Sequence, residues 1–486
     1  MSSSVLVIGG GPAGLTAALR LSTHGYAVRL LEQRSELGGR LISSGTGPGD
    51  CRTRHGSFPH GSAAYTEHFP TVLLGCHTAT LAVLKSLGTR HLVEFPQQLR
   101  FEFVLPGPRR VRLGRPWLPG PFGAILSAAT FRGLPLRDRW RVLSLLERTW
   151  EGDPALSLDL ESRSGEDWLK DIGQSDTARA QFWAPLARFL TGDDVAVVSA
   201  SALINMVRRC FLSARQHSAL AIPTHGIASL LLEPIHDRIA RSGAVIRLET
   251  RATQIRFDTN RVIGVVLQDG TVSSADWYLV ALPHRQLVAL LPERALTHFS
   301  YFQQLTQLTD SSALTLHVRI DCSVPNPQLL LLAHRTYHWI VCRPHHDSEQ
   351  KGCIMSLVAV GRPELLERPD QELLDIALSE VAYAFPGLTT AKVLGSRIIR
   401  QPHAYLSMRP GTSLLRPLQQ SPYPNLLLAG DWTDTGLPAS LEGAVLSGIR
   451  CAEAIITSGG SKQVPQGERR AARGDRQEPL CGPRHD

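Results

Sequence analysis

The stretch Val5-Leu-Val-Ile-Gly-Gly-Gly-Pro-Ala-Gly14 decides the fold, because a short apolar strand runs directly into a glycine-rich turn and then a helix. Gly9, Gly11 and Gly14 have the G-x-G-x-x-G spacing of a dinucleotide-binding turn. The first glycine allows the tight turn, the second lets backbone approach a pyrophosphate, and the third lets the helix pack closely on the strand. We therefore expect phosphates at the N-terminus of this helix.

The residues that follow support a Rossmann-like α/β unit. An amphipathic helix is predicted over Leu15–Ser22, and the run Tyr26–Leu31 predicts a second strand that ends on Glu32. Glu32 comes eighteen residues after Gly14, where an acid accepts hydrogen bonds from ribose hydroxyls and disfavours a 2′-phosphate. A glycine turn without a ligand is the alternative, and the agreement of strand, helix and acid argues against it.

Composition sets the class of protein. With 486 residues, 43% of them hydrophobic, the chain is long enough for two interleaved domains with their own cores. No apolar run approaches the ~18 residues of a membrane span, and the apolar N-terminus is a strand of the nucleotide fold, so we expect no signal peptide. We expect a cytoplasmic location, the inner face of a membrane included. The eight cysteines contain no C-x-x-C pair, which indicates reduced thiols and no structural metal.

The net charge of +8 is unevenly placed, because residues 100–150 hold ten arginines against three acids. The segments Arg115–Leu126 and Ala129–Arg137 also carry proline and large apolar residues, which suits peripheral contact with an anionic membrane. A solvated basic face over a helical cap is an equal alternative. We do not expect nucleic acid as a partner, because no recognised binding motif accompanies the charge.

The rest of the chain predicts a second, mixed α+β domain. Ser164 is expected to cap a helix whose first turn holds Glu166 and Asp167, and a helix is predicted over Leu365–Tyr383. Runs such as Ala313–Ile320 predict an antiparallel sheet that floors a substrate pocket. The predicted domain order is nucleotide-binding domain 1–58, helical cap of the substrate domain 59–225, nucleotide-binding domain 226–285, substrate sheet 286–400, nucleotide-binding domain 401–458 and a disordered tail 459–486.

Two further motifs resemble one superfamily. Leu37-Gly-Gly-Arg40 and the segment Asn425–Gly448, which contains Gly430-Asp431, are similar to those of the FAD-dependent amine oxidase, phytoene desaturase and protoporphyrinogen oxidase superfamily. The resemblance implies non-covalent FAD, an Asp that holds a cofactor hydroxyl, and a helix N-terminus that stabilises reduced flavin at its N1–C2=O edge. The cofactor-binding residues expected are Gly9, Gly11, Pro12, Ala13, Gly14, Glu32, Gly39, Arg40, Ala252, Gly430, Asp431, Leu441 and Glu442.

A narrower resemblance is to hydroxysqualene dehydroxylase, on Asp431–Gly443 with weaker support from Val72–Cys76, Trp117–Pro121, Phe182–Leu186 and Ala221–Pro223. It implies that hydroxysqualene, a polyisoprenoid, is reduced to squalene with loss of water at the expense of FADH2. Hydride would pass from flavin N5 to an allylic carbon while an acid or an ordered water protonates the leaving hydroxyl.

The sequence departs from that family before Val72. The family has an Asp-Asn-Gly-Gln-His segment where this chain has Glu67-His-Phe-Pro-Thr71, so Thr71 replaces the usual histidine. Glu67, His68 and His77 are the candidate catalytic proton donors in its place, although such side chains are often only solvated.

Three other functions stay open. An amine oxidase is disfavoured, because no lysine occurs between Lys170 and Lys351 and Ser440 stands where that family has an aromatic residue. A carotenoid desaturase shares the fold and the substrate class and differs in the direction of electron flow. A flavin-binding pathway partner without chemistry is the third.

Overall fold

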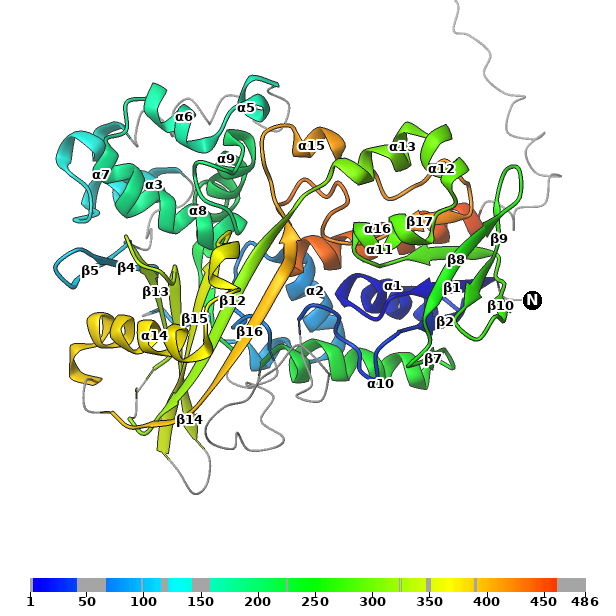
Figure 1. Cartoon of the computed structure of the whole chain (residues 1–486), viewed down its shortest axis with the longest axis horizontal. Helices are drawn as coiled ribbons and strands as arrows, with labels where there is room; N and C mark the ends of the chain where they lie inside the picture. Colours follow the sequence, from blue (N-terminus) through cyan, green and yellow to red (C-terminus); the bar gives the residue numbers. More distant parts are fainter. Residues whose placement is uncertain are drawn as a thin grey trace, which may run out of the picture.

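A parallel sheet forms around the first strand of the chain. The computed structural model describes residues 3–41, 67–97, 99–114, 121–141, 158–223, 226–322, 324, 326–346, 351–388 and 391–460. Five parallel strands pair in the order β17-β11-β1-β2-β7. They are β1 (Ser4–Ile8), β2 (Ala27–Leu31), β7 (Val245–Arg247), β11 (Trp277–Val280) and β17 (Leu426–Leu428). The predicted Rossmann-like fold is confirmed, and its strands come from distant parts of the chain (Figure 1).

Helices cover one face of this sheet. The side chains of Val5 and Val7 share a core with α1 (Pro12–Thr23), α10 (Glu233–Arg241) and α16 (Leu441–Gly460). α1 and α16 pack closely: a Cβ on Gly448 would come within 2.3 Å of the Ala13 carbonyl oxygen. The opposite face, with Leu6 and Ile8, packs on a three-stranded sheet of β8 (Ala252–Phe257), β9 (Val262–Leu267) and β10 (Val272–Ser273).

A second, seven-stranded sheet has the order β16-β12-β15-β14-β13-β4-β5. Its pairs are antiparallel except for β13 with β4. Its strands are β4 (Glu102–Leu105), β5 (Arg109–Arg112), β12 (Asp310–Ile320), β13 (Gln328–Leu332), β14 (Trp339–His346), β15 (Lys351–Val360) and β16 (Val393–Leu406). The helix α14 (Asp370–Ala384) packs on one face through a core that includes Leu373 and Val381 (Figure 1).

The described residues between 121 and 212 form the mainly helical cap, as predicted. Phe103 of β4 stacks with Phe182 at a ring distance of 5.4 Å, which joins this cap to the seven-stranded sheet. Ser164 caps α6 as expected, since its hydroxyl accepts from the Asp167 amide at 3.1 Å. The cap contains α3 (Pro121–Thr130), α5 (Leu158–Ser162), α6 (Gly165–Asp171), α7 (Asp176–Ala178), α8 (Ala184–Thr191), α9 (Ala200–Val207) and the π-helical turns η4 (Arg179–Trp183) and η5 (Arg208–Leu212).

Short elements connect these layers. They are β3 (Leu73–Leu74), which pairs with β6 (Leu220–Ala221), the π-helical turn η7 (Ala228–Leu232), and α2 (Thr78–Leu87), α11 (His284–Leu290), α12 (Glu293–His298), α13 (Ser300–Gln303) and α15 (Thr412–Leu415).

Some predicted limits need correction. The boundary at 400 falls inside β16, which stays in the seven-stranded sheet to Leu406, and the boundary at 285 falls inside α11. The helix predicted from Leu365 starts at Asp370, because Pro363 and Pro369 favour a short turn before it. Residues 42–66, the part of the predicted tail beyond 460, and the predictions on 115–120 and 142–150 lie outside the described residues.

No helix in the described part of the chain is both long and apolar enough to cross a membrane.

Candidate active site

Of the three motif glycines after β1, two are tightly packed and one, Gly11, faces open space. A Cβ on Gly9 would lie 2.5 Å from the Ala281 carbonyl oxygen, and one on Gly14 would lie 2.0 Å from the Gly9 oxygen. These two glycines are therefore required by the packing of strand and helix. A Cβ on Gly11 would meet no atom within 4 Å, although Gly11 stands at the N-terminus of α1. The turn thus presents backbone to an open cradle of the kind that receives phosphates.

Glu32, at the end of β2, closes the other side of this turn. Its carboxylate is 6% exposed and accepts from the Gly10 amide at 2.7 Å and the Arg34 amide at 2.9 Å. Both bonds fix local backbone, and the residue still lines the cavity.

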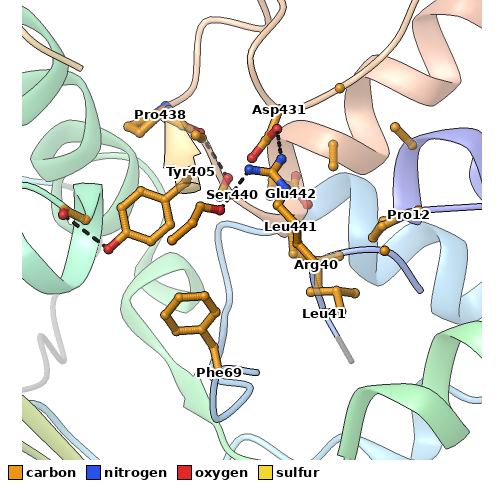
Figure 2. Close-up of a pocket in the computed structure, with 18 of the residues that line it drawn as sticks. Pro12, Arg40, Leu41, Phe69, Tyr405, Asp431, Pro438, Ser440, Leu441 and Glu442 are labelled. Carbon is orange, nitrogen blue, oxygen red and sulfur yellow. Dashed lines mark hydrogen bonds and ion pairs between the residues drawn. The ribbon is translucent and has the colours of Figure 1, made fainter. Parts of the chain in front are cut away.

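An ion pair joins the motif Leu37–Arg40 to the motif that contains Gly430 and Asp431. Arg40 donates from Nη2 to Asp431 Oδ1 at 2.5 Å and from Nη1 to the Ala404 carbonyl oxygen at 2.8 Å (Figure 2). Asp431 follows β17, and Gly430 before it has φ 155°, with its amide donating to Ser447 Oγ at 3.0 Å. Residues nearly four hundred positions apart therefore form one wall.

A cavity of about 360 Å³ joins these parts to an aromatic region. Phe69, Phe189, Trp339 and Tyr405 line this cavity, and Figure 2 shows the Phe69 and Tyr405 rings away from Pro12. The ring centroids are 5.9 Å apart for Phe69 and Tyr405, and 5.6 Å for Phe189 and Trp339. The Tyr405 hydroxyl donates to the Gly192 carbonyl oxygen at 3.2 Å, so the polar tip of this side chain is satisfied by protein. The nucleotide-binding motifs thus line one part of the cavity, and aromatic side chains line another.

The model of the flavin containing amine oxidoreductase family matches residues 12–456. The chain belongs to this family. It is 26% identical to a 15-cis-phytoene desaturase from Glycine max over 93% of this chain and 79% of that one. It is 22% identical to a zeta-carotene desaturase from a Synechocystis strain, over 93% of this chain and 97% of that protein.

Two solved structures share the fold of this chain. Cyclohexylamine oxidase from Brevibacterium oxydans superposes with a TM-score of 0.68 at 19% identity, over 95% of this chain and 100% of that one. An oxidoreductase from Methanosarcina mazei gives 0.69 at 17% identity, over 93% and 100%.

FAD is the cofactor of the present protein, as a member of the flavin containing amine oxidoreductase family, and the residues that line its cavity fit this cofactor. The cradle at Gly11 and the N-terminus of α1 suit the pyrophosphate, and Arg40 with Asp431 suits its neighbouring hydroxyls and charge. A second cavity of about 230 Å³ shares Gly9, Gln33 and Leu282 with the first, and its lining includes Ala252, one of the predicted cofactor-binding residues. No group of three or more His, Cys, Asp or Glu in the described ranges is placed to hold a metal.

The carboxylate of Glu442 binds the start of α2. Its carboxylate is 3% exposed and accepts from the amides of Ala79 and Thr80 at 2.8 Å each and from the Thr80 hydroxyl at 2.7 Å. Its side chain therefore caps α2 and ties it to α16, while the residue still lines the cavity, so a contact with the cofactor stays a prediction. Leu441 beside it lines the cavity.

Glu67 does not fit a proton donor. It is 0% exposed, pairs with Arg343 Nη2 at 2.8 Å, and accepts from the Ile227 amide at 2.5 Å and the Thr71 amide at 3.0 Å. Glu67 is not among the residues that line the cavity, so its partners make it a structural carboxylate. His68 also lies outside that lining, and its Nδ1 is 2.6 Å from Gln401 Nε2.

His77 is the one of the three predicted donors that lines the cavity. It stands at the N-cap of α2, and its Nδ1 accepts from the Leu74 amide at 3.3 Å, which leaves the proton of the neutral ring on Nε2. Burial lowers the pKa of His77, the nearby Glu442 opposes that shift, and Arg209 adds to it. A catalytic role for His77 stays a prediction.

The sequence did not reveal Arg416, which holds the second motif in place. Its guanidinium is buried and donates to carbonyl oxygens of the loop after β17, at 2.9 Å for Asp431 and 2.5 Å for Leu437, and to Thr433. Burial lowers the pKa of Arg416 to about 10, so it keeps its charge. No local motif surrounds this residue, and only the folded loop brings its acceptors together.

Proposed function

We propose that this FAD-dependent oxidoreductase acts on a polyisoprenoid, and that it reduces hydroxysqualene to squalene with loss of water. The observation that carries the proposal is the aromatic, apolar end of the cavity, continuous with the end that holds the flavin motifs. A long hydrocarbon chain buries apolar surface there, and at roughly 25 cal/mol per Å² this supplies most of its binding free energy.

The charges on the cavity wall favour an uncharged substrate over an amine. Three carboxylates line the cavity, and each already has partners: Glu32 holds backbone amides, Asp431 pairs with Arg40, and Glu442 caps α2. Arg209 lines the cavity as well, and its positive charge disfavours an ammonium group, whereas Arg188, also in the lining, pairs with Asp194.

The direction of the reaction has two candidates. The segment Asp431–Gly443 favours dehydroxylation, in which the flavin supplies one hydride, which carries both electrons, one proton is added, and the hydroxyl leaves as water. The names of the relatives, phytoene and zeta-carotene desaturases, favour the reverse flow, in which a polyisoprenoid gives two electrons and two protons. The same cavity serves both, and His77 Nε2 is the group that we propose beside the leaving hydroxyl.

Ligand binding tests the substrate class. We expect squalene to perturb the absorption of the bound flavin and cyclohexylamine to leave it unchanged. The variant Phe189→Leu, which widens the apolar end, should weaken the squalene effect several-fold, whereas Phe257→Leu should not, because Phe257 packs on Tyr423 away from the cavity. Perturbation by the amine and not by squalene would overturn the proposal.

We also propose that one face of the cap rests on an anionic bilayer, where such substrates reside. Phe122 and Trp140 are 66% and 72% exposed, Leu136 is exposed beside them, and Arg132 and Arg137 are exposed between these apolar side chains. Apolar residues inserted at the headgroup level with arginines on lipid phosphates are the usual basis of peripheral binding.

A further inference from the structure

Two thiols meet at the wall of the cavity. Cys76 Sγ lies 3.5 Å from Cys210 Sγ, although the residues are 134 positions apart. Cys76 follows β3, and Cys210 lies in the π-helical turn η5, an element type often found at functional sites.

The backbone around this pair is fixed by close packing. The Gly75 amide donates to the Ala219 carbonyl oxygen at 2.9 Å, and the Cys76 amide donates to the His217 oxygen at 3.2 Å. A Cβ on Gly75 would lie 1.8 Å from the Gln216 carbonyl oxygen, so only glycine allows this approach. The thiols are therefore held together by the fold and not by a flexible loop.

The two thiols differ in access and charge. Cys76 lines the cavity together with Arg209, whereas Cys210 is 0% exposed and is not among the lining residues. The hydrogen bond with Cys210 lowers the pKa of Cys76, burial and Glu442 oppose that shift, and Arg209 adds to it, while the same hydrogen bond and burial raise the pKa of Cys210. Because Cys76 lines the cavity beside a cation, it is the member of the pair that can meet small molecules there.

We propose that Cys76 is a peroxide-reactive site and that Cys210 is its resolving thiol. The Cys76 thiolate attacks hydrogen peroxide, which breaks the O–O bond, forms a sulfenic acid and releases hydroxide. Cys210 then attacks the Cys76 sulfur, a disulfide forms, and the hydroxyl leaves as water with the Cys210 proton. The two thiols lose two electrons in total and peroxide accepts them. The sulfurs approach by about 1.5 Å to reach a disulfide length of about 2.05 Å, which links β3 to η5 across the cavity wall.

A second thiol pair provides an internal control. The thiols of Cys342 and Cys353 are hydrogen-bonded to each other, and this bond lowers the pKa of Cys353 as it does for Cys76. This pair is buried between the seven-stranded sheet and α14, and neither residue is among those that line the cavity. It matches the first pair in mutual hydrogen bonding and differs in access.

The test treats the reduced holoprotein with about one equivalent of hydrogen peroxide and maps thiols by peptide mass. We expect a Cys76–Cys210 disulfide, with Cys342 and Cys353 still reduced. In Cys210→Ser, Cys76 should accumulate as a sulfenic acid trapped by dimedone, and in Cys76→Ser, Cys210 should stay unmodified. Retained flavin absorption shows that each variant is folded, and Cys342→Ser should behave as wild type. Equal oxidation of both pairs, or no reaction at Cys76 in the folded protein, would overturn the proposal.

Discussion

At the scale of single residues, buried charges organise the site more than the motif residues themselves do. Arg416 binds several carbonyl oxygens of one loop, a task that needs the fork of a guanidinium. Glu67 and Arg343 similarly connect the segment before β3 to the seven-stranded sheet. Removing one partner leaves the other buried and unpaired, which costs about 3–5 kcal/mol.

Replacing Arg416 by lysine should release the loop after β17. Lysine keeps the charge but has only one donor nitrogen, so carbonyl oxygens are left unsatisfied, at about 1–3 kcal/mol each. We expect a thermal midpoint lower by several degrees and FAD affinity reduced about tenfold or more, measured by thermal unfolding and fluorescence titration. Arg450 donates to Asp434 of the same loop from an exposed position, so Arg450→Lys is the matched control and should change little. Equal effects of the two variants would contradict this role.

His317 should make the fold sensitive to acid. Its Nε2 donates to the Glu67 carbonyl oxygen at 3.1 Å and its Nδ1 accepts from Ser356 Oγ at 2.8 Å. Burial, followed by the charge of Arg343, lowers the pKa of His317 to about 3. Arg397 and His68 also face it.

Because the folded pKa lies below the unfolded value of about 6.5, the unfolded state binds the proton first. The stabilisation is complete above pH 6.5 and is lost as the pH falls towards 3, by about 2 kcal/mol at pH 5. The thermal midpoint should therefore drop less between pH 7.5 and pH 5 in His317→Gln than in the wild type. His236→Gln, at an exposed position on α10, should follow the wild type; identical drops in all three proteins would refute the assignment.

At the scale of elements, some glycines are required by packing between helices, such as Gly448, and others by the space for the cofactor, such as Gly11. Gly11→Ala places a Cβ in open space at a backbone conformation that alanine adopts, so the apoprotein should keep its thermal midpoint. The same Cβ fills the cradle, and FAD affinity should fall at least about tenfold. Gly448→Ala should instead destabilise the protein with or without FAD, because its Cβ meets the Ala13 carbonyl oxygen at 2.3 Å. Wild-type FAD affinity of Gly11→Ala in a fluorescence titration would contradict the placement of the pyrophosphate.

Elements with local signals were predictable from the sequence, and contacts between distant elements were not. The strand, glycine turn and helix at Val5–Gly14, the Ser164 cap and the strands of the second sheet follow from periodicity and capping. The cap that Glu442 forms on α2 depends on two segments 362 positions apart, so the family motif alone suggested a cofactor ligand. Phe189 and Trp339 become cavity residues only when the cap packs on the sheet.

At the scale of the whole molecule, the cavity lies where the nucleotide domain, the seven-stranded sheet and the helical cap meet. Figure 1 shows the cap at one end of the molecule and the parallel sheet at the other. The exposed residues Phe122, Leu136 and Trp140 belong to the cap, so the bilayer contact that we propose would lie at the cap end of the molecule.

Vesicle binding tests this orientation. The protein should co-sediment with vesicles that contain phosphatidylglycerol and bind much less to phosphatidylcholine alone, and added salt should weaken it. The double variant Leu136→Ser, Trp140→Ser should lose most of the binding, since both side chains are exposed and contribute little to the core. The matched variant Leu414→Ser, Leu418→Ser removes equally exposed apolar residues outside the cap and should bind as wild type. Equal binding by both variants would show that this face does not contact lipid.

The central claim is that the cavity brings a polyisoprenoid to the flavin, and a single turnover without oxygen tests it most directly. The photoreduced protein is mixed with hydroxysqualene, and flavin oxidation is followed together with product mass. We predict one squalene formed for each flavin oxidised. Bleaching of the oxidised protein by phytoene, with a product two hydrogens lighter, would instead establish the desaturase direction. If neither polyisoprenoid exchanges electrons with the flavin, the account of the substrate is contradicted.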